Sequence, residues 1–301
     1  MNRNDISWHG SYAVIVTPFT QDGAIDEAAY RQIINNIIEA GCHGVISTGS
    51  TGEFFLMSEA ERHRVVEICV DEVRGRIPVL GAPAAMRTED VVSYTKHAKR
   101  AGCDGVMVMP PVYVPMTDRE VIEYYSRVAG EGGLPIMLYN SPGAVRASLT
   151  PKLVAELVKL DEVVAIKDSS WDIIQVSNLI RHVGSEIKIF VGVEDMLVPS
   201  LAIGADGAVA MLPQLLGKMP VELYNAWQRG EYELARELHF KIARMYDLFR
   251  ITSYIGIKEA MRMVGLPGGY TRPPVLPLTE EQRAEIRAML QDIGMLPARA
   301  A

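Results

Sequence analysis

Residues 40–46 read AGCHGVI, and closely similar strings return as AGCDGVM at residues 101–107 and as IGADGAV at residues 203–209. Each string predicts the end of a helix, a glycine cap, a short turn with a second glycine, and the start of an apolar strand. The first glycines lie at positions 41, 102 and 204, and the gaps between them fit two and four units of about 25–31 residues, the size of a strand-plus-helix repeat. The strings therefore indicate an internal βα period.

Eight short apolar segments fit this period as strands. They are predicted at residues 12–16, 44–47, 78–81, 106–109, 135–139, 163–167, 188–192 and 208–211. Amphipathic helical segments separate them, and the first, residues 26–40, begins at an acidic cap and places Tyr30, Ile33 and Ile37 on one face. Eight βα units without a domain break predict an α/β fold, the (β/α)8 TIM barrel.

The chain continues beyond the eighth unit. Helical patterns follow at about 231–249, 253–265 and 279–293, and the link at residues 267–277 is rich in proline and glycine. We therefore expect two parts: a catalytic barrel domain at residues 1–225, and a C-terminal helical extension at residues 226–301 that packs on the barrel.

Composition and charge narrow the functional class. The chain has 301 residues, of which 49% are hydrophobic, and a net charge of −7 with no basic run, so nucleic acid is not an expected partner. Residues 1–6 contain no apolar signal region, and no stretch of about 18 uncharged apolar residues occurs. We expect a soluble, cytoplasmic protein without a membrane partner.

The cysteines and histidines give no metal-binding spacing. The three cysteines, Cys42, Cys69 and Cys103, are too few for a disulfide framework, and no Cys-x-x-Cys or His-x-x-x-His pair is present. Cys42 and Cys103 share one position of the repeat, where packing under the turn is the first interpretation and reactivity the alternative. We expect no metal site, and the glycine motifs of nucleotide-binding proteins are also missing.

A lysine ends the sixth predicted strand, where residues 163–167 read VVAIK. Four apolar residues in a row are typical of a strand covered on both faces. Burial disfavours the ammonium form, and a neutral amine can attack a ketone to form an imine. The alternative is that Lys167 pairs with a nearby carboxylate such as Asp168.

Two other strand ends carry polar groups, and strand ends hold the chemistry in barrels of this kind. Residues 49–53 read GSTGE, whose hydroxyls and free backbone N–H groups suit a carboxylate. A tight turn before a helix is the alternative for this segment. Tyr139 ends the fifth strand, so its phenol is expected near Lys167, where it can relay protons. Plain packing inside the barrel is the alternative for Tyr139.

An amine nucleophile, a phenol and a carboxylate cradle together suit a 2-oxo acid. The amine captures the ketone, and the resulting imine acts as an electron sink. Loss of a proton then gives an enamine that bonds to an aldehyde, and the reverse sequence cleaves a C–C bond. The same sink can expel a β-leaving group as water or ammonia. This chemistry requires no cofactor.

The same segments closely resemble the dihydrodipicolinate synthase / N-acetylneuraminate lyase family of Schiff-base barrels. The resemblance rests on four motifs in register: VTPF at 16–19, GSTGE at 49–53, YN-x-P at 139–142 and IKDS at 166–169. It implies that Lys167 is the Schiff-base lysine and Tyr139 the proton relay. It also implies a homotetramer built as a dimer of tight dimers. The substrate-binding residues that follow from it are Ser50, Thr51, Gly52 and Val209, the last through its backbone.

The chain departs from the synthases of this family at two positions. Val112 occupies the slot of a tyrosine that those enzymes lend to the neighbouring subunit, and Tyr113 lies one residue off. Ala144 occupies the slot of an arginine that binds the aldehyde substrate's carboxylate, with Arg146 two residues later. Ser50 replaces the commoner threonine but keeps the hydroxyl.

We therefore favour a lyase or synthase that acts on pyruvate or a related 2-oxo acid. It would catalyse aldol cleavage or condensation, or the dehydration or deamination of a 2-keto-3-deoxy-type acid. The alternative is 4-hydroxy-tetrahydrodipicolinate synthase, which condenses pyruvate with aspartate semialdehyde in lysine biosynthesis. A non-catalytic barrel that senses a keto acid is a third hypothesis. Phe54, Phe55, Met109 and Met211 suggest a partly apolar second pocket, with packing as the equal alternative.

Overall fold

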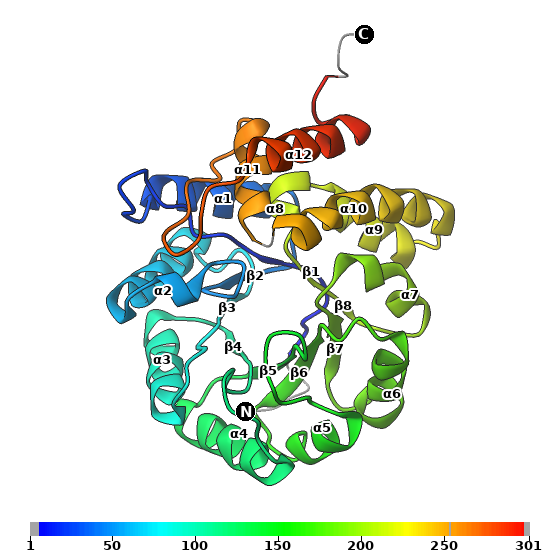
Figure 1. Ribbon diagram of the computed structural model, residues 1–301. Coiled ribbons are helices and arrows are strands. Elements are labelled where there is room, and N and C mark those ends of the chain that lie inside the picture. Colours follow the sequence, from blue (N-terminus) through cyan, green and yellow to red (C-terminus); the bar gives the residue numbers. More distant parts are fainter. Residues whose placement is uncertain (1–5, 253, 298–301) are drawn as a thin grey trace.

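A closed barrel of parallel strands forms the centre of the computed structural model, which describes residues 6–252 and 254–297 (Figure 1). The strands are β1 (Gly10–Val14), β2 (Gly44–Ser47), β3 (Val79–Gly81), β4 (Gly105–Val108), β5 (Ile136–Asn140), β6 (Val163–Asp168), β7 (Lys188–Val191) and β8 (Gly207–Ala210). Each pairs with the next, and β8 closes on β1. The predicted barrel is confirmed, although β1 begins and ends two residues earlier than predicted.

The repeated string forms the same turn three times. Gly41, Gly102 and Gly204 have φ angles of +87°, +98° and +103°, which residues other than glycine rarely adopt. The second glycine of each string begins β2, β4 or β8. The repeat therefore marks the passage from an outer helix back into the barrel, as predicted.

Helices surround the barrel. They are α1 (Glu27–Glu39), α2 (Glu59–Val73), α3 (Thr88–Ala101), α4 (Asp118–Gly132), α5 (Pro151–Leu157), α6 (Ile173–Val183), α7 (Leu197–Ala202) and α8 (Pro213–Leu216), with short 3-10 turns η2 (Phe54–Leu56) and η3 (Glu194–Met196). The face of α1 that was predicted to be apolar is buried against the barrel. Its acidic cap, Asp26, accepts a hydrogen bond from the Ala29 N–H at 2.9 Å.

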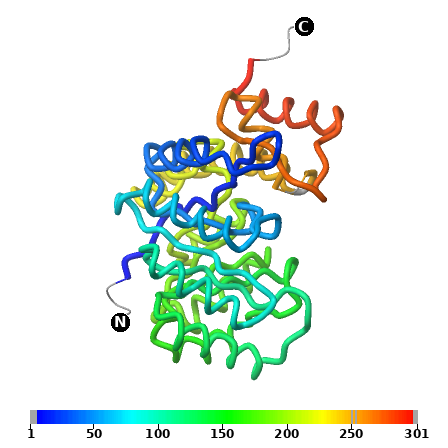
Figure 2. Tube along the Cα trace, turned by 90° about the vertical axis from the view of Figure 1, so that its left-hand side faces the viewer, coloured from blue at the N-terminus to red at the C-terminus, as the bar shows by residue number. Residues whose placement is uncertain are grey.

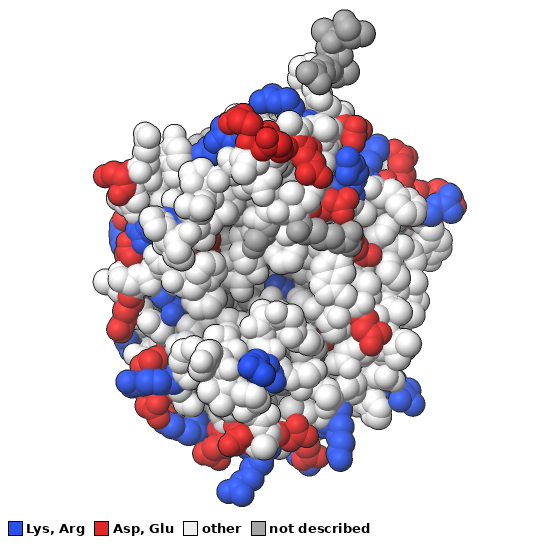
Figure 3. Space-filling model, viewed as in Figure 1, with Lys and Arg blue, Asp and Glu red and all other residues white. Residues whose placement is uncertain are grey.

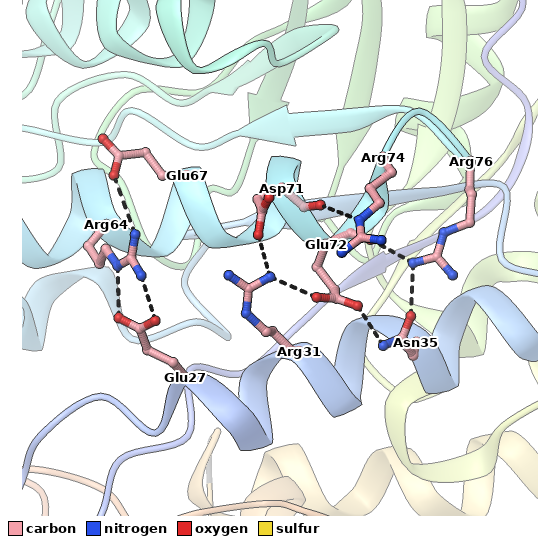
Figure 4. Close-up of polar contacts among 9 residues, drawn as sticks. All are labelled: Glu27, Arg31, Asn35, Arg64, Glu67, Asp71, Glu72, Arg74 and Arg76. Atoms are coloured by element: carbon pink, nitrogen blue, oxygen red, sulfur yellow. Dashed lines mark hydrogen bonds and ion pairs between the residues drawn. The ribbon is translucent and has the colours of Figure 1, made fainter.

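A polar network joins α1 to α2 on the outside of the barrel (Figure 4). Arg31 reaches Asp71 and Glu72 at 2.5 and 2.7 Å, and Arg64 reaches the Glu27 carboxylate through two bonds of 2.8 and 2.6 Å. These groups are partly exposed, so each pair is expected to contribute less than about 1 kcal/mol. The network therefore links two neighbouring helices of the outer ring.

The C-terminal helices lie together at one side of the barrel, beside α1 (Figures 1 and 2). They are α9 (Met219–Gln228), α10 (Tyr232–Thr252), α11 (Ile255–Met263) and α12 (Glu280–Asp292). The boundary predicted between residues 225 and 226 falls inside α9. Residues 1–5, 253 and 298–301 of the predicted parts lie outside the described residues. The division into two parts stays a prediction.

Aromatic side chains fill the barrel below the strand ends. Tyr12 is 1% exposed, and its ring meets that of Phe190 edge-on with centroids 5.4 Å apart. Tyr12 precedes Val14 by two residues, so both project from the same face of β1, into the barrel. This packing closes the barrel interior below the cavity that opens at the C-terminal ends of the strands. None of the helices in the described part of the chain is long and apolar enough to cross a membrane.

Candidate active site

A cavity of about 420 Å³ opens at the C-terminal ends of the strands. Five of the predicted site residues line it, namely Ser50, Thr51, Tyr139, Lys167 and Val209. Figure 3 looks onto this face and shows a central hollow whose surroundings are largely uncharged, while acidic and basic side chains gather at the perimeter. A cavity of this size can enclose a small organic acid together with a further substituent.

Lys167 and Tyr139 meet at the base of this cavity. They are register partners on β6 and β5, so both side chains project inward from adjacent strands. The Lys167 Nζ atom lies 4.3 Å from the centroid of the Tyr139 ring. Lys167 is 5% exposed and Tyr139 is 8% exposed. The amine and the phenol ring therefore lie against one another, and both side chains are largely buried.

Asp168 does not act as the partner of Lys167. Its carboxylate accepts hydrogen bonds from Asn140 at 2.6 Å and from the Ser170 hydroxyl at 2.5 Å. Successive residues of a strand point to opposite faces, so a lysine directed into the barrel places the next residue outside it. The alternative interpretation of Lys167 as one half of an ion pair with Asp168 is therefore wrong.

Gly192 leaves the space that Lys167 occupies. A Cβ atom at position 192 would lie 2.5 Å from the Lys167 Cε atom and would also clash with the Ser169 hydroxyl. A side chain there would displace the lysine, so the position that follows β7 is restricted to glycine. The lysine stem is thus held by backbone on one side and by the Tyr139 ring on the other.

The surroundings of Tyr139 favour its ionised form. Burial raises the pKa of the phenol, but the Lys167 amine and the hydroxyls of Ser141 and Ser169 outweigh it, so the pKa lies below its ordinary value. A phenol whose pKa lies closer to neutral pH is better suited to both the loss and the uptake of a proton during a reaction. This property suits a residue that relays protons.

Ser50 and Thr51 form the opposite side of the cavity. Thr51 is 4% exposed, and the Glu53 N–H donates to the Ser50 carbonyl at 3.0 Å, which closes a tight turn around them. Tyr254 from the C-terminal extension shares a hydrogen bond with Ser50, and burial raises the pKa of Tyr254 to about 12. The segment therefore forms the tight turn, and its role as a carboxylate cradle stays a prediction.

Gly52 is the one predicted site residue that does not line the cavity. Its carbonyl accepts a hydrogen bond from the Thr17 hydroxyl at 2.8 Å, on the side toward the barrel wall. A Cβ atom at this position would lie 3.1 Å from the Ile15 carbonyl. Gly52 therefore allows the turn to pack closely, and its prediction as a substrate contact is not supported by this geometry.

Glu194 is a buried acid that the sequence analysis missed. It is 2% exposed, and its Oε1 accepts hydrogen bonds from the Met211 and Leu212 N–H groups at 2.7 and 2.8 Å. Its Oε2 is buried without a hydrogen-bond partner among the described residues. Burial raises the pKa of Glu194 to about 7, against the opposing effect of those N–H groups and of Lys167. Its position shortly after the seventh strand could have indicated that it lies near the active site.

Aromatic side chains from distant parts of the chain complete the cavity. Trp171 follows β6, and Tyr246, Phe249 and Tyr254 come from α10 and the start of α11. The residues of the C-terminal extension could not be predicted from their position after a strand, because they follow no strand. Trp171 does follow a strand, so its position in the sequence could have indicated that it lines the cavity.

The residues expected to form a second apolar pocket are divided by the structure. Met211 lines the main cavity, whereas Phe54 and Met109 line a hollow of only about 10 Å³ beside Ser50 and Tyr139. Phe55 is 52% exposed. A hollow of that size holds at most one water molecule, so packing is the better interpretation of Phe54 and Met109.

The structure also shows where the two positions that depart from the synthase pattern, 112 and 144, lie relative to the cavity. Ala144 lines the cavity, whereas Arg146 is exposed and does not. Val112 is half-buried, and Tyr113 is 74% exposed outside the cavity. Within the described ranges no group of three or more histidine, cysteine, aspartate or glutamate side chains could hold a metal ion.

Comparison with known proteins extends these observations over the whole chain. Residues 7–293 match the model of the Dihydrodipicolinate synthetase family. The chain is 32% identical over 291 residues to a 4-hydroxy-tetrahydrodipicolinate synthase from Methanopyrus kandleri, covering 96% of this chain and 97% of that one. It is 34% identical over 292 residues to an uncharacterized DapA-like lyase from Rhizobium meliloti, with the same coverage of 96% and 97%.

A solved structure agrees in fold. YagE, a prophage protein of the dihydrodipicolinic acid synthase family from E. coli K12 crystallised in complex with pyruvate, superposes with a TM-score of 0.93 at 28% identity. The match covers 97% of this chain and 100% of that protein. The C-terminal helices are therefore part of the shared architecture.

Proposed function

The chain is a lyase of the dihydrodipicolinate synthetase family, and from that premise we propose that Lys167 forms a Schiff base with pyruvate or a related 2-oxo acid. The observation that carries the proposal is the Lys167–Tyr139 pair, an amine 4.3 Å from a phenol ring at the base of a cavity. Within the described part of the chain the lysine forms no ion pair with a carboxylate, which leaves its amine available for chemistry.

The proposed reaction begins with attack of the Lys167 amine on the ketone carbon. Tyr139 transfers protons so that the carbonyl oxygen leaves as water and an imine remains. Loss of a proton from the adjacent carbon moves its electron pair into the imine and gives an enamine. The enamine then forms a C–C bond to an aldehyde, and the reverse steps break that bond. In a 2-keto-3-deoxy-type acid, the same electron pair would expel water or ammonia.

Ser50 and Thr51 are proposed to hold the carboxylate of the 2-oxo acid. They lie on the turn after β2, and Val209 of β8 lines the same cavity. Neutral hydroxyl and N–H donors suffice for a carboxylate, because each hydrogen bond to a charged acceptor is stronger than one between neutral groups. This arrangement would orient the ketone carbon toward the amine.

The alternative is condensation of pyruvate with aspartate semialdehyde, which the names of several relatives support. Against it stands Ala144 on the cavity wall, whereas Arg146 is exposed and does not line the cavity. A product assay with these two substrates decides between the readings. A rate as high as with other 2-oxo acids would favour the synthase.

Assembly and location form part of the proposal as expectations. Apolar side chains are exposed on the loops after β2, β3 and β4, at Phe55, Met86, Tyr113 and Val114. Such side chains support an interface with a second copy, in line with the proposed homotetramer built as a dimer of dimers in the cytoplasm. Analytical ultracentrifugation tests the tetramer, and a monomer at micromolar concentration would contradict it.

Borohydride trapping tests the Schiff base directly. The protein is treated with pyruvate and sodium borohydride, digested, and examined by mass spectrometry. We expect a stable adduct on the peptide that contains Lys167 and none in Lys167→Ala. Lys159→Ala serves as the matched control, because its side chain is 68% exposed and pairs with Glu156 on the surface. Absence of an adduct with every 2-oxo acid tried, with keto-acid binding retained in Lys167→Ala, would favour a non-catalytic sensor instead.

A further inference from the structure

We infer that the outer part of the cavity selects substrates whose end remote from the keto acid is uncharged and aromatic or apolar. The inference rests on the proposed function, because it names the substrate class for the same site. It is carried by a continuous aromatic wall, defined here as Trp171, Tyr246, Phe249 and Tyr254, all of which line the cavity.

The members of the aromatic wall touch one another in sequence. Trp171 and Tyr246 meet edge-on with ring centroids 5.2 Å apart and an interplanar angle of 66°. Tyr246 and Phe249 lie 5.9 Å apart, and Phe249 and Tyr254 lie 5.3 Å apart. Each separation falls in the range of favourable aromatic pairs. The wall is thus a preformed surface, and a ligand ring can add to it without rearranging it.

Trp171 is held in a conformation that needs an explanation. Its φ angle is +63°, in the left-handed region, where a bulky residue is unusual and costs about 1 kcal/mol or more. The hydrogen bonds on both sides enforce this turn: Ser170 donates to Asp168 at 2.5 Å, and Asp172 caps α6 by accepting from Ile174 at 2.8 Å. The turn places the indole against Tyr246 at the cavity mouth. Backbone strain of this kind concentrates at functional sites.

The remaining surface of the cavity offers little to a charged substituent. Of the described residues that line it, Lys167 alone carries a charged side chain, and the proposed reaction uses that amine. Gly143 and Ala144, which carry no charge, also line the cavity. An anion enclosed without a partner loses several kcal/mol of hydration, whereas a ring placed against an aromatic neighbour gains about 0.5–1.5 kcal/mol beyond its burial.

A polyhydroxylated substituent fits less well for a related reason. Hydroxyl groups removed from water need partners, and two of the hydroxyls near the wall are already engaged. Ser170 donates to Asp168, and Tyr254 shares its hydrogen bond with Ser50. The ring faces of Trp171 and Phe249 offer no hydrogen-bonding atoms to a sugar-like chain. The observations therefore favour an apolar or aromatic group.

Adduct trapping with a matched pair of acids tests the inference whichever bond the enzyme breaks. Benzylpyruvate and 2-oxoadipate share the keto-acid end but finish in a phenyl ring and a carboxylate. The concentration that gives half-maximal trapping on Lys167 is measured for each and divided by the value for pyruvate. We expect this ratio to be at least about tenfold lower for benzylpyruvate than for 2-oxoadipate, a difference that corresponds to about 1.4 kcal/mol. An equal or lower ratio for 2-oxoadipate would overturn the inference.

Substitutions in the aromatic wall test whether the wall causes the preference for benzylpyruvate. Trp171→Leu and Phe249→Leu should each reduce the preference for benzylpyruvate over 2-oxoadipate by about fivefold, since each removes one ring contact. The matched controls are Trp227→Leu, whose ring packs on Tyr232 in another part of the fold, and Phe240→Leu, which is 66% exposed. A preference that is unchanged in the wall variants, or equally reduced in the controls, would overturn the assignment.

A second measurement separates this inference from the proposed function. Phenylbutanoate and adipate lack the ketone, so calorimetric titration with them reports binding without Schiff-base formation. If pyruvate gives no adduct, the proposed function fails. Tighter binding of phenylbutanoate than adipate, lost in Trp171→Leu, would still support the aromatic wall, and the opposite order would refute it.

Discussion

Glu53 and Lys258 form an ion pair in which each side chain is only 2% exposed, and the pair joins the Ser50–Thr51 turn to the C-terminal extension. Glu53 also accepts a hydrogen bond from Thr271 at 2.5 Å, and Lys258 donates to the Tyr270 carbonyl at 2.9 Å. Burial lowers the pKa of Lys258 to about 8, and Glu53 opposes that effect. The extension therefore anchors the turn that is proposed to hold the substrate carboxylate.

Removal of one partner of this pair should destabilise the protein strongly. Lys258→Met leaves the Glu53 carboxylate buried without a counter-charge, and we expect a loss of about 3–5 kcal/mol in the free energy of unfolding. The double variant Glu53→Gln with Lys258→Met should be more stable than the sum of the two single effects implies. Urea unfolding followed by circular dichroism measures both. Additive losses would show that the two side chains do not stabilise each other.

The phenol of Tyr139 is predicted to matter for rate more than for binding. Tyr139→Phe keeps the ring against Lys167 but removes the proton relay, so adduct formation with pyruvate should slow by about a hundredfold or more. The concentration of pyruvate at half-maximal rate should change far less. Tyr232→Phe is the control, because that side chain is 57% exposed on α10 and does not line the cavity. A Tyr139→Phe rate within a factor of about two of the parent would assign the relay to another group.

Glu194 should make stability fall as pH rises. Its pKa is raised to about 7 in the folded protein, so the unfolded chain releases this proton first, near pH 4.3. The stabilisation is therefore complete below about pH 4 and is lost as pH rises through about 7. Glu194→Gln keeps an acceptor for the Met211 and Leu212 N–H groups but does not titrate. Between about pH 4 and pH 7 the free energy of unfolding of the parent should fall by on the order of 3 kcal/mol relative to that of this variant.

Urea unfolding of both proteins at a series of pH values measures this difference, because the other titrating groups are common to both. A difference that does not change between about pH 4 and pH 8 would mean that Glu194 titrates at an ordinary pKa. Glu222→Gln is a suitable control, since its carboxylate is on the surface and pairs with Arg229.

The cysteines are predicted to be inert in the folded protein. Cys42, Cys69 and Cys103 are all buried, and burial raises the pKa of Cys42 and of Cys103 to about 12. Because the thiolate is the reactive form, iodoacetamide at pH 8 should label none of them until the protein is unfolded in urea. Mass spectrometry of the two samples gives the result. Rapid labelling of Cys42 or Cys103 in the folded protein would instead support the reactive interpretation of that position.

The barrel and the Lys167–Tyr139 pair could be predicted from the sequence because each depends on local patterns. Glycine caps and apolar runs determine where strands begin and end, and the alternation of side chains along a strand decides which residues point inward. Ser50 and Thr51 follow from the same rule, since they come directly after a strand. The direction of the Gly52 carbonyl does not follow from it, because that depends on Thr17 across the turn.

The chain alone therefore determined the (β/α)8 architecture and the strand ends that hold the amine, the phenol and the hydroxyls. Only the tertiary structure decided what surrounds them: the buried Glu194, the aromatic wall, and the Glu53–Lys258 pair. The hydrogen bond between Thr271 and Glu53, for instance, joins residues 218 positions apart. Periodicity acts over a few neighbouring residues, whereas such contacts depend on how the extension packs against the barrel, and no local pattern records that.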